Sequence, residues 1–225
     1  MNTGNRPTPL LQPFPSKEQI NDAMATLILS ASGWRKVFAG SGDEESRSAS
    51  LLIADQVITT GMALAFGRTL IERQGKTDII AAVATDSRPT GPLMADIAIR
   101  VLLSLGIAVK YSGVTATPEL LAAVQRKDKI YGFCYLSASH NPVGHNGVKF
   151  GFEDGSVAGG EESKSLISLF KSIMSTAYEG EFENAVFGCD PQALADVYDC
   201  IPGWKASTYS CYLSFASAVA AGSDE

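Results

Sequence analysis

Residues 78–105, DIIAAVATDSRPTGPLMADIAIRVLLSL, decide the fold class of this 225-residue chain. The first part, residues 78–85, is a nearly continuous apolar run, which is typical of a strand buried on both faces of a sheet. After a short polar turn, Thr90 is a candidate N-cap for a helix. That helix has one apolar stripe at 3.6-residue spacing, formed by Met94, Ile97, Ala98, Val101, Leu102 and Leu105. The stretch therefore predicts a buried strand followed by a helix that packs on it.

The same alternation continues along the chain. Residues 107–113 and 129–137 are further apolar runs, and residues 118–125 between them have a helical pattern. Two successive crossovers of this kind predict an α/β fold with a mostly parallel, mixed sheet and helices on both faces. A further strand is expected over 147–152 and a closing helix over 161–175.

The N-terminal part, up to about residue 75, does not show this alternation of strands and helices. Residues 1–15 contain four prolines and predict an irregular arm. Residues 16–25 open with S-K-E-Q, a capping-box pattern, and predict a short helix. Residues 25–34 resemble a strand that ends in a turn at Ser32–Gly33. A solvated acidic loop then leads to a long helix over about residues 50–75.

Domain organisation follows from these patterns. We expect one α/β domain over residues 16–180. Residues 181–225 have weak periodicity and are left unplaced, with the start of a second domain as one interpretation.

Composition excludes several classes of partner. The 18 basic and 24 acidic residues give a net charge of −6, which argues against nucleic acid or an anionic membrane as the main partner. There is no signal-peptide pattern, and no apolar run approaches the ~20 residues that span a bilayer. The four cysteines have neither CxxC nor zinc-site spacing, so we expect a cytoplasmic protein with reduced thiols, in which Cys134 belongs to the core.

Residues 135–150, YLSASHNPVGHNGVKF, contain both histidines of the chain. Asn141 precedes Pro142, so the backbone after Ser139 is stiff and can hold that hydroxyl in one place. Lys149 alternates with apolar residues of the following strand and should face away from the core, with room left by glycines 147 and 151. Lysine and histidines together give local positive potential, although His145 is interpreted as a surface residue.

Three interpretations of this loop remain open on these grounds. It is a structural turn, a serine nucleophile for acyl transfer, or a serine that carries a phosphate. Acyl transfer is disfavoured because the G-x-S-x-G pattern is absent and neighbouring side chains on an extended segment point apart. A phosphoserine carries about −1.5 to −2 charge at neutral pH, which matches the cationic surroundings.

Three motifs then carry a family resemblance. SASHNP at 137–142, followed by NGVKF at 146–150, resembles the phosphoserine loop of the α-D-phosphohexomutases, the phosphoglucomutase/phosphomannomutase superfamily. SGWRKVF at 32–38 resembles the family's N-terminal segment, and ATDSRPTG at 84–91 resembles its D-x-R-x-[ST]-G stretch. The resemblance covers about residues 26–178, the extent of the family's first domain.

The resemblance implies a set of site residues. Ser139 would be the phosphorylated serine, with His140 and Lys149 in proton transfer and charge stabilisation and Arg35 as a further catalytic cation. Arg35, Asn141, Lys149 and Arg88 would bind substrate or phosphate. For Arg88, an alternative is that it shapes the loop through Asp86.

The resemblance also implies chemistry that reaches beyond this sequence. The family interconverts hexose 1-phosphates and hexose 6-phosphates through a bisphosphate, with Mg²⁺ held by an aspartate loop of its second domain and by the phosphoserine. That D-G-D-[GA]-D-R loop is not found in this sequence. We therefore expect Mg²⁺ to contact this chain only through the phosphate on Ser139, and a glucose 1,6-bisphosphate-type activator to supply that phosphate.

The expected partners are hexose phosphates and domains II–IV of the same enzyme, and the isolated chain is expected to be inactive. The alternative function is that of a catalytically incomplete fragment, which acts as a phosphosugar-binding or regulatory module.

Overall fold

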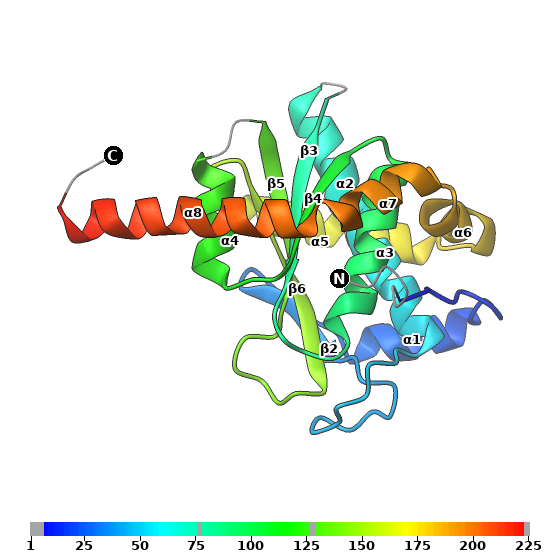
Figure 1. The fold of residues 1–225 in the computed structure, drawn as a ribbon. Helices are drawn as coiled ribbons and strands as arrows, with labels where there is room; N and C mark the ends of the chain where they lie inside the picture. The colour runs from blue at the N-terminus through cyan, green and yellow to red at the C-terminus, as the bar shows by residue number, and fades with distance from the viewer. Residues whose placement is uncertain (1–6, 76–77, 127–128, 223–225) are drawn as a thin grey trace.

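A six-stranded mixed sheet forms the centre of the molecule (Figure 1), in a computed structural model that describes residues 7–75, 78–126 and 129–222. The strand order is β1-β2-β6-β5-β3-β4. β3 pairs in parallel with β4 and β5, and the pairs β1–β2, β2–β6 and β5–β6 are antiparallel. The bounds are β1 Ile28–Ser30, β2 Gly33–Val37, β3 Ile80–Thr85, β4 Ala108–Val114, β5 Ile130–Leu136 and β6 His145–Phe152. The expected mixed α/β sheet is confirmed, and the two crossovers account for its parallel half.

Helices cover both faces of the sheet, as predicted (Figure 1). One core contains buried side chains from α2, α3 and α5 together with one face of β3, β5 and β6. The second core lies on the other face, where Ala82, Ala84, Phe133 and Tyr135 pack against α4 and against Trp204 of the C-terminal helix α8 (Ile201–Ala220). The bounds are α1 Lys17–Ala25, α2 Ile53–Gln74, α3 Gly91–Ser104, α4 Thr117–Arg126 and α5 Gly160–Ser175.

Of the strand predicted over 25–34, Ile28–Ser30 is extended as β1 and ends in a turn as expected, but the strand β2 that follows the turn was not predicted. The segment folds as a hairpin of β1 and β2, and its turn is closed by the Ser30 hydroxyl, which donates to the Gly33 carbonyl at 2.8 Å. Gly33 has a φ of 134°, a value that side-chain-bearing residues rarely adopt. The sequence pattern hid β2 because the charged Lys36 is a buried residue of that strand.

The N-terminal arm is irregular over its described part, residues 7–15, and is held to the rest of the fold by a few buried residues. Residues 1–6 of the predicted arm lie outside the described residues. Leu11 is only 1% exposed. The ring of Phe14 contacts that of Phe182, with centroids 6.1 Å apart, and Gln12 donates to Glu179 and Glu183. These contacts attach the arm to the C-terminal part of the chain.

The segment that the sequence left unplaced is helical, comprising α6 Glu179–Phe187, α7 Pro191–Asp199 and α8 Ile201–Ala220. α6 packs on α2 and α3. α8 packs across β4 and α4, and its C-terminal end extends past α4 (Figure 1). Buried Glu119 accepts hydrogen bonds from Lys205 and Thr208 of α8. No helix in the described ranges has both the length and the hydrophobicity that a membrane span requires. The domain boundary at residue 180 stays a prediction.

The loops that follow β3 and β5 meet at the carboxyl edge of the sheet. The Asp86 amide donates to the Leu136 carbonyl at 3.0 Å, and the Ser137 amide donates to the Gly147 carbonyl at 3.0 Å. Ligands of α/β sheets usually bind at this edge. The edge therefore brings residues 86–90, residues 137–144 and the start of β6 to one place.

Candidate active site

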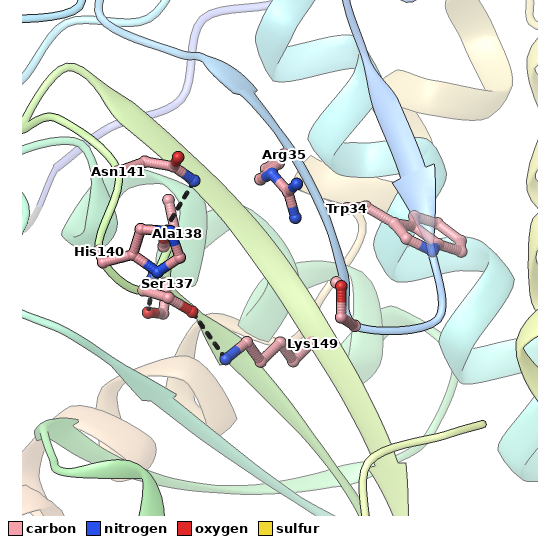
Figure 2. A pocket seen from close by; sticks show the side chains of 10 residues that line it. Trp34, Arg35, Ser137, Ala138, His140, Asn141 and Lys149 are labelled. Atoms are coloured by element: carbon pink, nitrogen blue, oxygen red, sulfur yellow. Dashed lines mark hydrogen bonds between the residues drawn. The ribbon is translucent and has the colours of Figure 1, made fainter.

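A cavity of about 180 Å³ is lined by Ser139 among other residues. Figure 2 shows Arg35, His140 and Lys149 around it. Three segments line it: the β1–β2 turn with the start of β2, the loop after β5, and β6. Of the predicted site residues, the cavity brings together Arg35, Ser139, His140, Asn141 and Lys149. Its other lining residues are Ser32, Gly33, Trp34, Ser137 and Ala138. The predicted residues therefore share one site, with Arg88 behind it.

Ser139 is held through each of its polar atoms. Its amide donates to the Ser137 hydroxyl at 3.1 Å, and its carbonyl accepts from Arg88 Nη2 at 3.1 Å. Its hydroxyl accepts a hydrogen bond from Lys149 Nζ at 2.9 Å. The residue has a left-handed φ of 57° and is exposed. This conformation is uncommon outside glycine and clusters at functional sites. Sequence reasoning missed the supporting role of Ser137, although both serines stand in the same motif.

Lys149 reaches Ser139 over a glycine. Val148 and Phe150 on either side of it are buried, as the alternation predicted, while Lys149 faces the cavity. A Cβ on Gly33 would lie 3.1 Å from Lys149 Cγ, so this glycine leaves room for the lysine stem. The sequence signal for this role is the glycine of the turn expected at Ser32–Gly33.

Glycines 147 and 151 have roles other than the expected room around Lys149. A Cβ at Gly147 would lie 2.1 Å from the Trp34 carbonyl oxygen, so this glycine lets β2 approach β6. A Cβ at Gly151 would lie 2.1 Å from the Ser156 carbonyl oxygen. Both glycines thus serve backbone packing of the sheet.

Arg35 points into the cavity from β2 because its neighbours are fixed on the other face. Trp34 is buried and packs on Phe150, with ring centroids 5.2 Å apart. Lys36 is also buried and forms an ion pair with Asp55 of α2 at 2.5 Å. Burial raises the pKa of Asp55, and the adjacent ammonium of Lys36 opposes that rise. The Arg35 guanidinium itself has no hydrogen bond to any described residue.

Arg88 organises the loop. Its Nε donates to Asp86 at 3.1 Å, and its Nη1 donates to the Pro142 carbonyl and, at 3.1 Å, to the His145 carbonyl. Its Nη2 donates to the Ser139 carbonyl at 3.1 Å and to the Asn141 carbonyl at 2.5 Å. A guanidinium has five N–H groups, and all five are used here. The geometry favours the loop-shaping role for Arg88 over phosphate binding.

The remaining loop residues differ in their surroundings. The His140 ring is exposed at the cavity and has no hydrogen bond within the described part of the chain. Asn141 Nδ2 donates to the Ala138 carbonyl at 3.0 Å, which closes the turn. His145 is the first residue of β6, half-buried, with Nε2 3.3 Å from Glu44 Oε2 and a buried Nδ1 that meets no partner among the described residues.

The charges of the lining indicate the kind of ligand. Arg35 and Lys149 are cationic and no carboxylate of a described residue lines the cavity, so it suits an anion. Within residues 7–75, 78–126 and 129–222, there is no group of three His, Cys, Asp or Glu side chains that could hold a metal ion. Cys134 is buried, and burial raises the pKa of its thiol, so it is an unreactive core residue as predicted.

Comparisons with known proteins agree with this geometry. A family model described as phosphoglucomutase/phosphomannomutase, alpha/beta/alpha domain I, matches residues 26–177. A phosphoglucosamine mutase from Ligilactobacillus salivarius is 33% identical over 128 residues, which cover 55% of this chain and 28% of that protein. Another from Lacticaseibacillus casei is 38% identical over 109 residues, covering 46% and 24%.

A solved structure extends the likeness to the fold. The crystal structure of a protein assigned as a phosphomannomutase from Thermus thermophilus has a TM-score of 0.52 and 28% identity. It covers 64% of this chain, which in turn covers 30% of that protein. The chain thus spans about a quarter of the length of the curated relatives it matches.

Proposed function

The chain belongs to the phosphoglucomutase/phosphomannomutase family, and from this premise we propose that it carries the phosphoserine of a phosphohexomutase at Ser139. The whole reaction would interconvert a hexose 1-phosphate and a hexose 6-phosphate. The observation that carries the proposal is the 2.9 Å hydrogen bond from Lys149 to the Ser139 hydroxyl in a cavity that suits an anion.

The proposed cycle consists of two phosphoryl transfers. In the first, the P–Oγ bond of phosphoserine 139 breaks and a P–O bond forms to the free hydroxyl of the sugar phosphate, giving a hexose bisphosphate. The proton of that hydroxyl leaves to a base, for which the exposed His140 ring is the candidate. The departing serine oxygen takes a proton from Lys149 Nζ, which donates to it. In the second transfer the serine oxygen returns that proton to Lys149 and takes the other phosphate from the bisphosphate, and the product hydroxyl regains its proton from His140.

Lys149 is suited to the serine side of this exchange. When the P–Oγ bond breaks, negative charge develops on the serine oxygen, and Lys149 Nζ already donates to that atom. Charge stabilisation and positioning account for most of the catalysis in phosphoryl transfer. Arg35, whose guanidinium is uncommitted among the described residues, can bind an equatorial phosphate oxygen from the other wall.

Mg²⁺ does not fit the side chains of this chain alone. The cavity has cationic and neutral donors but no carboxylate from a described residue. A metal ion bound there would meet only the phosphoserine oxygen from this chain, and its other ligands would come from domains II–IV. When bound, it would neutralise charge on the phosphate.

A chimaera tests the proposal. Residues 26–177 replace the matching segment of the Ligilactobacillus salivarius phosphoglucosamine mutase, and folding is checked by circular dichroism. We expect glucose 1,6-bisphosphate to label Ser139, as mapped by peptide mass spectrometry, and turnover to disappear in Ser139→Ala. Ser137→Ala is the matched control and should still be labelled.

Two outcomes would contradict the proposal. A folded chimaera labelled at Ser137, or at neither serine, removes Ser139 as the phosphate carrier. A folded chimaera that binds a hexose phosphate without any phosphoryl transfer supports the alternative, a phosphosugar-binding module.

A further inference from the structure

Arg88 separates two sides of the phosphoserine loop. Ser139 and Asn141 line the catalytic cavity, and they also line a second cavity of about 310 Å³ that contains Asp86 and Arg88. Lys149 lines the first cavity and Arg88 the second. The loop therefore separates the two cavities, with the Arg88 guanidinium on one side of it and the Lys149 ammonium on the other.

The Arg88 guanidinium binds the backbone carbonyl groups of this loop. It has no N–H group left for a further ligand, because its five N–H groups are donated to Asp86 and to the carbonyls of residues 139, 141, 142 and 145. The Asp86 carboxylate also accepts the Arg88 amide at 3.0 Å, so the guanidinium plane is fixed from its own segment. The loop carbonyls must consequently face Arg88.

Peptide geometry then sets the direction of the opposite group. The peptide bond between Ser139 and His140 is trans, and in a trans peptide the N–H points away from the C=O of the same unit. Since the Ser139 carbonyl faces Arg88, the His140 N–H faces the catalytic cavity, which His140 lines. That N–H has no acceptor among the described residues.

We propose that the His140 backbone N–H donates a hydrogen bond to the phosphate on Ser139, and that Arg88 is the positioning residue that directs it there. A phosphate on Ser139 Oγ is attached one residue before this N–H, within reach of it. Backbone N–H groups aligned by a turn are good donors to anions, and a bond to a charged acceptor is stronger than a neutral one.

The inference rests on the proposed phosphoserine but is tested separately from it. Phosphoserine is incorporated at position 139 of the 225-residue chain during translation, so no enzymatic phosphorylation is needed. The amide resonances are followed by ¹⁵N–¹H NMR while pH is varied, and the phosphate is followed by its ³¹P resonance.

We expect the His140 amide proton to move downfield as the phosphate loses its second proton, with the same midpoint as the ³¹P resonance. A scalar coupling between the His140 ¹⁵N and ³¹P nuclei should accompany it. The Asn141 amide is an internal control, because it donates to the Ala138 carbonyl at 3.2 Å and should move much less.

Arg88→Lys tests the positioning role, because one ammonium cannot hold five acceptors in the same geometry. In this variant the His140 displacement and coupling should be lost. Thr90→Val is the matched structural control: it removes the buried hydrogen bond from Asn146 Nδ2 to Thr90 Oγ1, at 2.9 Å, at the base of the same loop but leaves the Arg88 contacts. It should lower the melting temperature and keep the His140 signal.

The outcomes separate the possibilities. A His140 amide that does not follow the phosphate in the parent chain overturns the proposal. An amide that follows it equally in Arg88→Lys shows that Arg88 is merely structural. If the NMR result is as expected while the chimaera is not labelled by glucose 1,6-bisphosphate, the mutase function fails and the phosphate-binding geometry stands.

Discussion

Replacing Lys149 should change the acidity of a phosphate on Ser139. The ammonium lies 2.9 Å from the serine hydroxyl, so in the phosphorylated chain it will be adjacent to the phosphate oxygens. A neighbouring cation favours the dianion over the monoanion and therefore lowers the second pKa of the phosphate. Lys149→Met removes that cation, and the pKa should rise toward the value of about 6 for a free phosphoserine.

The magnitude follows from the separation and the exposure. Two unit charges about 4 Å apart interact by about 1 kcal/mol in water and by about 4 kcal/mol at an effective dielectric constant of about 20. Ser139 is exposed and Lys149 is half-buried, so the lower part of this range applies, about 1–2 kcal/mol. One pKa unit corresponds to about 1.4 kcal/mol, so the expected rise is about 1 unit.

The assay is a ³¹P NMR titration of the 225-residue chain with phosphoserine at position 139. Lys110→Met is the matched control, because β4 lies three strands from β6, about 14 Å away and beyond the Debye length of about 8–10 Å. The unfolding free energy of Lys149→Met should stay within about ±0.5 kcal/mol, as for surface substitutions. An unchanged phosphate pKa, or a shift of equal size in Lys110→Met, would refute the electrostatic role of Lys149.

Three further predictions concern the stability of the fold and the activity of the isolated chain. Gly147→Ala should destabilise the fold by about 1–3 kcal/mol in urea denaturation, because the new methyl would meet the Trp34 carbonyl oxygen; an unchanged midpoint would contradict this. Lys36→Met should cost about 3–5 kcal/mol at pH 8, since it leaves the buried Asp55 carboxylate unpaired. Burial raises the folded-state pKa of Asp55 above the unfolded value of about 3.9. Relative to the parent chain, this variant should therefore lose stability as pH rises above about 4, and adding Asp55→Leu should restore it. The isolated chain should show no Mg²⁺-dependent turnover of glucose 1-phosphate or mannose 1-phosphate above its Ser139→Ala variant; serine-dependent turnover would contradict the proposal that further domains are needed.

The parallel half of the sheet could be predicted because its elements are local. Residues 78–85 become β3 and residues 129–137 become β5, within two residues of the expected bounds. Each is a short apolar run between turn residues, and the amphipathic helix that follows β3 packs on it. Such patterns need only the chain's own periodicity.

In the antiparallel half, the strand expected over 147–152 is confirmed as β6, but β2 was not predicted. β2 pairs with β6, more than a hundred residues later in the chain. Its Lys36 can be buried only because Asp55 of helix α2 forms an ion pair with it. α8 was left unplaced for a related reason, since its fully buried residue is the polar Thr208, which bonds to Glu119. In both places a polar side chain can be buried because its hydrogen-bond or ion-pair partner comes from another part of the chain.

The site shows the same limit at the level of single residues. The sequence left Arg88 with two possible roles, phosphate binding as for Arg35 or shaping of the loop, and could not decide between them. Arg88 has donated all five N–H groups to its own segment and to the loop, and it lies on the second cavity. Arg35 has donated none to a described residue and lies on the first. A guanidinium whose N–H groups are all donated can act on a ligand only through the backbone that it orients. A guanidinium with undonated N–H groups can bind the ligand itself. It follows that Arg35→Lys should mainly weaken direct anion binding, whereas Arg88→Lys should alter the geometry of every donor on the loop. The two substitutions are chemically identical, and only the hydrogen bonds of the folded chain distinguish their effects.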